Sequence, residues 1–350
     1  MNDTEATNAG PNPGDPTPPS SPEEGRRPDA SIDSLSTIYE RDLPDPVAGL
    51  VREYDEVVGI RDSFVWKWYY TIAPEYRLSC VAPERERAVR QDKLIAVLFT
   101  TLLDDFAERE GHDDTFATAK RIPFAAEQVD PDAVAGDTEH VRFTAAVWDA
   151  LIDRLADAPR HEEFADVLRF DLGQTVTSME YAELASAKPA LANPTESMRY
   201  GAQNMMMFVT LAIDLMNSPG FDTDDLGTLR AVTQEVQKLA RIGNWVSTWE
   251  RELDEGDVAA GVFAHALDRG VVTHEELAAL EADTGSAALR AAVRGRIDEA
   301  GTETRLLAEW WERYDALRAR EFDVESVDLD AYVAGMEPIL GYHLASRGHK

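Results

Sequence analysis

Three oxygen-bearing side chains follow one another at steps of four in the segment 244–257, which reads NWVSTWERELDEGD. They are Asn244, Thr248 and Glu252, and on an α-helix each such step turns the side-chain direction by only about 40°. An amide oxygen, a hydroxyl and a carboxylate are hard ligands, of the kind that Mg²⁺ takes while it keeps water and phosphate oxygens in its shell. Apolar residues recur at helical spacing through 226–253, so we predict a metal-binding stripe on a long amphipathic helix. Taken alone, such a row belongs more often to a solvated helix face than to a metal site.

A second group of potential ligands ends an apolar run in the segment 91–111. Residues 94–103 are apolar on nearly every side, which predicts a central, buried helix. Asp104, Asp105 and Glu108 come directly after this run, with Asp105 about 100° from the face that the other two share. Three carboxylates at the end of a buried helix repel one another and lose hydration unless cations compensate them. Either the helix enters solvent at this point, or the carboxylates hold metal ions.

The two groups lie on two predicted helices about 140 residues apart. If they face each other, they form a mouth that collects several Mg²⁺ ions. Mg²⁺ held by a few carboxylates, with phosphate oxygens completing its shell, is the usual way in which proteins bind a diphosphate.

The composition restricts the partners and the environment of the chain. Among its 350 residues, 66 are acidic and 34 are basic, for a net charge of −32. This balance argues against nucleic acid and against an anionic membrane, because both require basic patches. An acid-rich, lysine-poor surface is typical of proteins that work in concentrated salt, so we predict a halophilic source. The single cysteine, Cys80, and the lack of an apolar run of membrane-spanning length favour a cytoplasmic protein without stable membrane insertion.

The chain divides into a short leader and one domain. Residues 1–30 are rich in Pro, Gly, Ser, Asn and Glu, which predicts a disordered leader. Residues 31–350 show helical periodicity and no alternating strand pattern, so we predict a single all-α domain. The predicted helices cover 45–59, 61–71, 85–110, 137–157, 161–187, 195–217, 225–254, 258–268, 274–298, 301–321 and 328–346.

The two groups of ligands resemble the two metal motifs of class I terpene synthases, the all-α isoprenoid cyclases. The acidic group that begins at Asp104 is similar to the aspartate-rich DDxx(D/E) motif. The row that begins at Asn244 is similar to the NxxxSxxxE motif, with Thr248 supplying the hydroxyl. Arg251 stands where the family often has a basic residue, and the GD pair at 256–257 is common in the family.

The resemblance also extends to residues that would contact a diphosphate. Arg199 lies 45 residues before Asn244, close to the place of the family's diphosphate-sensing arginine. The family has a helix break after this arginine, and Gly201 would allow one here. Arg313 and Tyr314 resemble the family's late RY pair, although they lie closer to the second motif than is usual.

The resemblance implies a single-domain helical bundle of the class I isoprenoid synthase type with a central apolar cavity. It implies that three Mg²⁺ ions are held by Asp104, Asp105, Glu108, Asn244, Thr248 and Glu252, and that Arg199 and Arg251 bind the diphosphate, with Arg313 and Tyr314 as further catalytic residues. The implied reaction is ionisation of an acyclic C15 or C20 prenyl diphosphate, followed by cyclisation or rearrangement of the carbocation. Candidates for the apolar wall are Trp66, Tyr69, Phe99, Met205, Met206, Phe208 and Trp311.

Two alternatives remain open at this point. One is another enzyme of the same fold, a prenyltransferase that lengthens chains or joins them head to head. The other is a helical binding protein whose acidic stripes are merely solvated. The sequence also leaves open the chain length of the substrate, the product skeleton and the oligomeric state, a homodimer included.

Overall fold

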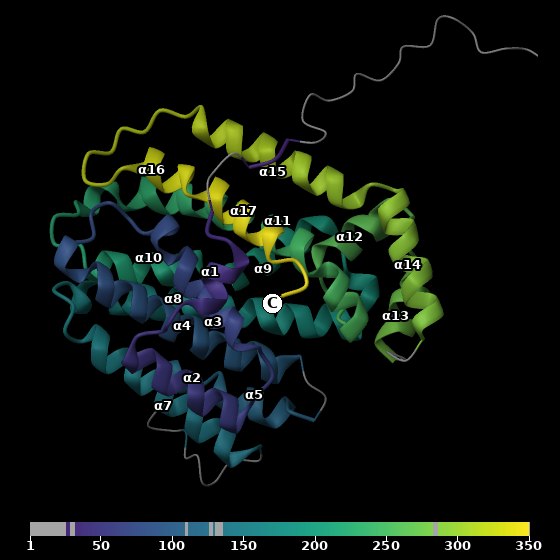
Figure 1. Ribbon diagram of the computed structural model, residues 1–350, viewed down its shortest axis with the longest axis horizontal. Helices are drawn as coiled ribbons and strands as arrows, with labels where there is room; N and C mark the ends of the chain where they lie inside the picture. The colour runs from purple at the N-terminus through teal and green to yellow at the C-terminus, as the bar shows by residue number, and fades with distance from the viewer. Residues whose placement is uncertain are drawn as a thin grey trace, which may run out of the picture.

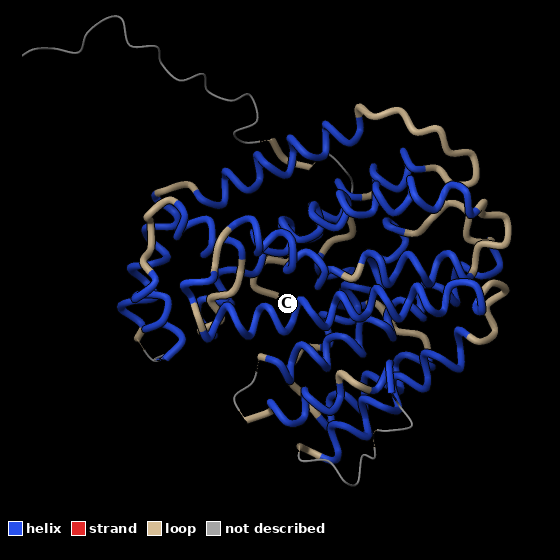
Figure 2. Tube along the Cα trace, turned by 180° about the vertical axis from the view of Figure 1, so that it is seen from behind, coloured by secondary structure: helices blue, strands red, loops and turns tan. Residues whose placement is uncertain are grey.

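The computed structural model describes residues 26–28, 32–108, 111–125, 129, 136–282 and 286–349. Within these ranges every regular element is helical and no β-strand occurs, as Figure 2 shows. The all-α class predicted from the sequence is therefore confirmed. None of the described helices is long and apolar enough to cross a membrane.

The helices follow in chain order. The first part of the chain forms α1 (Leu35–Glu40), α2 (Asp45–Val57), α3 (Ser63–Ile72), α4 (Glu86–Ala107), α5 (Asp113–Ala119), α6 (Ile122–Ala125), α7 (Thr138–Leu155) and α8 (His161–Ala187). The second part forms α9 (Pro194–Gly201), α10 (Met207–Met216), α11 (Leu226–Glu255), α12 (Gly261–Asp268), α13 (His274–Ala282), α14 (Ala287–Glu299), α15 (Thr302–Arg318), α16 (Leu329–Ala334) and α17 (Met336–Ala345). Short 3-10 turns among them are η1 (Ala73–Tyr76), η2 (Pro83–Arg85), η5 (Pro189–Leu191), η6 (Ala202–Met205) and η7 (Thr223–Asp225).

Helix α4 lies in the interior of the molecule, where it packs against α3, α7 and α10. Figure 1 shows α15 along one side, α2 and α7 along the opposite side, and α4, α8 and α10 between them. All residues of 94–103 except Thr101 are buried, as the unbroken apolar run predicts. Each fully buried large apolar side chain contributes roughly 1.5–3 kcal/mol. The burial of this run therefore fixes the position of the helix in the core, and with it the position of the acidic residues at its carboxy-terminal end.

Helix α11 is the second long element that matters for the site. It contains 30 residues and packs against α15, α17 and α10. Its apolar positions, such as Leu229, Val236 and Leu239, are fully buried at helical spacing. Gly261 at the start of α12 allows a close approach, because a Cβ at that position would lie 2.5 Å from the ring of Trp245 on α11.

The helix predicted over 195–217 is interrupted in the structure. Helix α9 ends at Gly201, a turn of 3-10 helix follows, and α10 begins at Met207. Between them Met206 adopts the left-handed conformation, with φ of 57°, and it is the sole residue other than glycine with positive φ among those described. This conformation costs free energy for a residue with a Cβ and is often found at functional sites. The helix is thus interrupted after Gly201, where the resemblance implies a helix break.

Other helices differ from the predicted ranges at their ends. The range 274–298 contains two helices, α13 and α14, and the range 328–346 contains α16 and α17. The short helices α1, α5 and α6 were not predicted, because a helix of four to seven residues has too few turns to show a periodic pattern.

Part of the segment predicted as a leader contacts the domain. The guanidinium of Arg26 lies 3.7 Å from the ring centroid of Trp311 on α15 and forms an ion pair with Asp315. The indole Nε1 of Trp311 donates a hydrogen bond of 3.2 Å to the carbonyl of Arg26. Residues 1–25 and 29–31, which make up the rest of the predicted leader and the first position of the domain, lie outside the described residues.

Candidate active site

The acidic residues at the end of α4 do not all point the same way. Asp104 and Glu108 line a cavity, whereas Asp105 is 2% exposed and turns away from it. The Oδ2 atom of Asp105 accepts a hydrogen bond of 2.7 Å from the hydroxyl of Tyr54, and its Oδ1 accepts one of 2.7 Å from Nε of Arg61. The roughly 100° between neighbouring positions on a helix produces this division. Asp105 thus anchors Arg61 rather than facing the cavity.

The row on α11 borders the same cavity. Asn244, Thr248 and Glu252 all line it, as their spacing of four residues on one helix face requires. The hydroxyl of Thr248 donates a hydrogen bond of 2.8 Å to the carbonyl of Asn244, which leaves its oxygen lone pairs available to a ligand. The structure therefore brings Asp104 and Glu108 together with the α11 row around one space.

The cavity between these helices has a volume of about 130 Å³. Its polar end is formed by the carboxylates and by the side chain of Asn204, whose Nδ2 donates a hydrogen bond of 3.1 Å to Asp104. Its apolar part includes Val65, Val97 and Met206. Of the predicted wall residues, Tyr69, Met205 and Met206 line this space, whereas Trp66, Phe99, Phe208 and Trp311 do not.

A fourth carboxylate reaches the cavity because of the way α11 ends. Gly256 adopts a left-handed conformation with φ of 84°, and its backbone N–H donates to the carbonyl of Leu253. The backbone N–H of Asp257 donates a hydrogen bond of 2.9 Å to the carbonyl of Glu252. These two bonds form a Schellman motif, which turns the chain back over the last helical turn. Asp257 consequently lines the cavity beside Glu252.

Three carboxylates that face the cavity, those of Glu108, Glu252 and Asp257, resist ionisation. Burial, followed by repulsion from Asp257, raises the pKa of Glu252 to about 7. Burial and the charge of Asp104 raise the pKa of Asp257, which also has a backbone hydrogen bond that opposes this shift. Burial and the charges of Asp104 and Asp257 raise the pKa of Glu108 well above its usual value. Carboxylates from the two helices therefore repel each other across the cavity, and a bound cation would relieve that repulsion.

Three arginines border this acidic space, namely Arg61, Arg241 and Arg251. Arg61 lies against the acidic end of α4, with Nη2 at 3.3 Å from Oε2 of Glu108. Burial disfavours the charged form of Arg61, but attraction to Asp105, Glu108 and Asp104 outweighs this effect and raises its pKa. On α11, Nη1 of Arg241 donates a hydrogen bond of 3.1 Å to Oδ1 of Asn244.

Several polar atoms in this site are buried without a hydrogen-bond partner among the described residues. They are Oε2 of Glu252, Nε of Arg241 and Nε of Arg251. Arg251 otherwise pairs with Glu255 and lies 3.9 Å from Glu252. A buried donor or acceptor left unpaired costs roughly 1–3 kcal/mol, and more when it is charged. Unpaired atoms of both kinds at one cavity are groups that water or a bound polar ligand would satisfy.

The remaining predicted site residues lie elsewhere. Arg199 is exposed on α9, with its guanidinium 5.4 Å from the ring of Tyr200, and it does not line the cavity. Arg313 pairs with Glu309 on its own helix, α15. Tyr314 is buried, stacks on Trp310, and does not line the cavity either.

The residues around the cavity suit Mg²⁺ by their chemistry. Among the described residues, no group of three or more His, Cys, Asp or Glu side chains is close enough together to hold a metal ion. Instead Asp104 and Glu108 come from one helix, while Glu252 and Asp257 come from the end of another. Mg²⁺ is commonly held by one or two carboxylates and completes its shell with water and phosphate oxygens. The buried Oε2 atom of Glu252, which has no hydrogen-bond partner among the described residues, is of the oxygen type that such an ion takes.

Three charged residues that line the cavity are not predicted as ligands or diphosphate-binding residues from the sequence. Arg241 precedes Asn244 by three positions on one helix, so the i, i+3 spacing was a usable signal. Asp257 was noted only as part of a common pair. Arg61 reaches the site through a tertiary contact that has no local signature.

Neither a model of a protein family nor a curated protein matches the chain. The resemblance to class I terpene synthases therefore rests on the residues of the two motifs alone.

Proposed function

We propose that the protein is a Mg²⁺-dependent class I terpene synthase, which ionises an acyclic C15 or C20 prenyl diphosphate and cyclises or rearranges the resulting carbocation. One observation supports this proposal above the others. Side chains of two motifs about 140 residues apart line one cavity, in which acidic and basic groups both retain unpaired buried atoms. A metal–diphosphate pair supplies the positive charge and the acceptor oxygens that these atoms lack.

Each group of residues has a defined task in this proposal. Asp104 and Glu108 on one side, and Asn244, Thr248 and Glu252 on the other, would hold Mg²⁺. Bound Mg²⁺ supplies Lewis-acid stabilisation of the negative charge on the leaving diphosphate.

The arginines and the apolar wall serve the two halves of the substrate. Arg241 and Arg251 direct N–H donors towards phosphate oxygens, a pairing that guanidinium geometry favours. Val65, Val97 and Met206 exclude water from the hydrocarbon chain, which protects a carbocation from premature quenching.

The size of the cavity adds a requirement. Its volume of about 130 Å³ is below the roughly 300–1,000 Å³ typical of small-molecule sites, so a prenyl chain needs side chains to move aside. Met205 and Met206 are suited to this, because methionine is unbranched and flexible.

The decisive experiment supplies C10, C15 and C20 prenyl diphosphates with Mg²⁺ in high salt, with and without isopentenyl diphosphate. We expect release of diphosphate and a cyclic or rearranged product by gas chromatography, without any need for isopentenyl diphosphate. A longer linear chain formed only in its presence, or a head-to-head dimer, would identify a prenyltransferase instead. If no substrate releases diphosphate, the remaining hypothesis is a helical binding protein without this activity.

Substitutions of single residues then test whether the reaction takes place in the acidic cavity. We expect Asp104→Asn and Glu252→Gln each to lower kcat by roughly 100-fold or more, the scale found when a transition-state charge contact is removed. Asp254→Asn is the matched control, since Asp254 is on α11 but exposed and paired with Arg294. Equal activity of all three variants would contradict the assignment of the site.

A further inference from the structure

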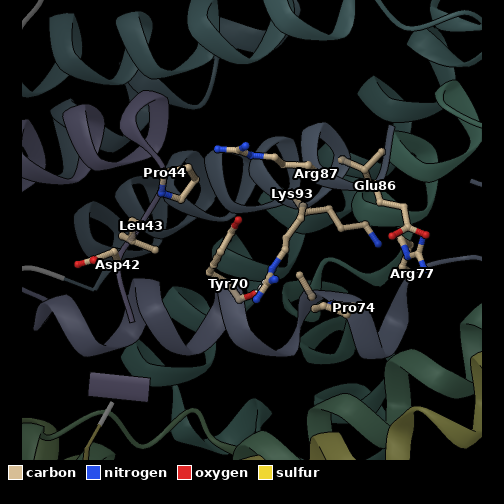
Figure 3. Close-up of a pocket in the computed structure, with 12 residues that line it drawn as sticks. Asp42, Leu43, Pro44, Tyr70, Pro74, Arg77, Glu86, Arg87 and Lys93 are labelled. Carbon is tan, nitrogen blue, oxygen red and sulfur yellow. Dashed lines mark hydrogen bonds and ion pairs between the residues drawn. The ribbon is translucent and has the colours of Figure 1, made fainter. Parts of the chain in front are cut away.

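A second cavity lies near the amino-terminal end of α4 and has a volume of about 530 Å³. Figure 3 shows its lining: Asp42, Leu43 and Pro44 on one side, and the paired Arg77 and Glu86 on the other. It is within the roughly 300–1,000 Å³ typical of small-molecule sites.

This cavity is far from the acidic site. It is lined by residues 86–93 of α4, whereas the acidic residues follow position 103 on the same helix. At 1.5 Å per residue, the 14 residues from Arg90 to Asp104 span about 20 Å. Arg90 is therefore about 20 Å along α4 from Asp104, and the two cavities have no lining residue in common.

The lining contains four basic residues in a protein whose acidic residues outnumber its basic ones by 32. Two of them are already neutralised. Arg77 forms an ion pair with Glu86, and Nζ of Lys93 lies 2.8 Å from Oδ2 of Asp214, with both side chains 1% exposed. The charge available to a ligand therefore comes from the other two, Arg87 and Arg90.

Neither Arg87 nor Arg90 has a carboxylate within 4 Å among the described residues. Nε of Arg90 donates a hydrogen bond of 2.6 Å to the carbonyl of Tyr70, and its guanidinium lies 3.8 Å from the Tyr70 ring centroid. Burial lowers the pKa of Arg90. Arg87 is exposed and has no hydrogen bond from its side chain in the described part of the chain. A half-buried guanidinium without a counter-ion is costly, and a bound anion would offset that cost.

Apart from the carboxylate of Asp42, the rest of the lining is apolar. Leu43, Pro44, Pro74 and Val89 border the cavity together with the ring of Tyr70. A small inorganic anion would leave this surface exposed to water, whereas a ligand with a hydrocarbon part would cover it.

We infer that this cavity binds a small amphipathic oxyanion, an organic phosphate ester or carboxylate that carries a short apolar chain. The guanidinium groups of Arg87 and Arg90 hold the oxyanion, and Leu43, Pro44 and Val89 contact the chain. This site is independent of the proposed function, since it lies about 20 Å along α4 from the acidic residues.

Isothermal titration calorimetry with octyl phosphate and with octanoate tests the inference, in buffer that contains EDTA. We expect one molecule bound per chain, at least ten times more tightly than octanol or inorganic phosphate. The tighter of the two amphipathic probes then identifies the headgroup that the site takes. Binding of neither probe, or equal binding of octanol, would overturn the inference.

Substitutions of single residues test whether the probes bind in this cavity. Arg87→Gln removes an exposed side chain, so it leaves folding intact and is expected to weaken binding at least tenfold, as is Arg90→Gln. The control Arg320→Gln removes an exposed arginine from the loop after α15 and should change the affinity less than twofold. Asp104→Asn should likewise leave the affinity unchanged. Wild-type affinity in Arg87→Gln, or weakened binding in Asp104→Asn, would show that the probe binds elsewhere and would reject the site.

Discussion

Nη1 of Arg241 donates a hydrogen bond of 3.1 Å to Oδ1 of Asn244, one turn further along α11. The guanidinium is thus held at the wall of the acidic cavity, while its buried Nε has no hydrogen-bond partner among the described residues. Arg199, the arginine that the resemblance favours for contact with diphosphate, is exposed on α9. The two residues can therefore be told apart by experiment.

We expect Arg241→Gln to lower kcat/KM for a prenyl diphosphate by roughly 100-fold, because a charge-assisted hydrogen bond to the leaving group is lost. Arg199→Gln should change it less than threefold. Steady-state assays of diphosphate release at fixed Mg²⁺ check both values. A larger loss of kcat/KM in Arg199→Gln than in Arg241→Gln would show that Arg199, and not Arg241, contacts the diphosphate.

The raised pKa of Glu252 predicts a pH-dependent stability of the metal-free protein. The folded chain keeps the Glu252 proton up to about pH 7, whereas an unfolded glutamate loses it near 4.5. The folded state therefore binds more protons in this interval, and the free energy of unfolding falls as pH rises from about 4.5 to 7. The fall attributable to this group is on the order of 3 kcal/mol at most.

Glu252→Gln should flatten that profile and stabilise the metal-free protein at pH 7–8. Urea denaturation at a series of pH values, in constant high salt with EDTA, measures the slope. Asp254→Asn provides the comparison, since it removes an exposed carboxylate of the same helix. An unchanged slope in Glu252→Gln would show that ionisation of this carboxyl does not oppose folding.

Removal of Arg61 should destabilise the fold as well as the site. Asp105 has a fully buried side chain whose charge is balanced by Arg61 at 2.7 Å. We expect Arg61→Gln to lower the free energy of unfolding by roughly 3–5 kcal/mol, since it leaves a buried carboxylate without its counter-ion. Tyr54→Phe, which removes one hydrogen bond to the same carboxylate, should cost only about 1–3 kcal/mol. Denaturant titrations of the two variants would contradict this account if Tyr54→Phe were the more damaging.

Two glycine-to-alanine substitutions, one of them in the turn at the end of α11, should change the free energy of unfolding in opposite directions. Gly256 has φ of 84°, so Gly256→Ala should destabilise the protein by about 1 kcal/mol and displace Asp257. Gly295 lies inside α14 with open space around the position of a Cβ, so Gly295→Ala should stabilise it by roughly 0.5–1 kcal/mol. Thermal or chemical unfolding of both variants checks the pair. Stabilisation by Gly256→Ala would mean that the turn is not held in the left-handed conformation.

The long helices were predictable because their patterns are local. Residues 94–103 form one apolar run, and α11 repeats apolar residues at helical spacing, so both helices and the polar groups on them were expected. The resemblance also implied a break after Arg199, near Gly201. The left-handed Met206 within it carries no sequence signal, because the conformation is imposed by packing.

The parts of the site that escaped prediction depend on tertiary contacts. Arg61 is 44 residues from Asp105, and the chain between them gives no hint that they pair. Asp104 faces the cavity and Asp105 faces away from it into the protein interior. Which of the two faces the cavity likewise depends on how α4 is rotated about its axis relative to the helices that surround it. Helical spacing places residues on a common face, but packing decides which face meets the cavity.

Helices α4 and α11 both end at the acidic cavity, with Glu108 just beyond the last residue of α4 and Glu252 in the final turn of α11. The carbonyl end of a helix has a partial charge of roughly −0.5, so the backbone adds about one further negative charge to the carboxylates. Amide substitutions cannot remove this contribution. In a variant with amides in place of these carboxylates, the two helix ends would still offset part of the positive charge of Arg61, Arg241 and Arg251.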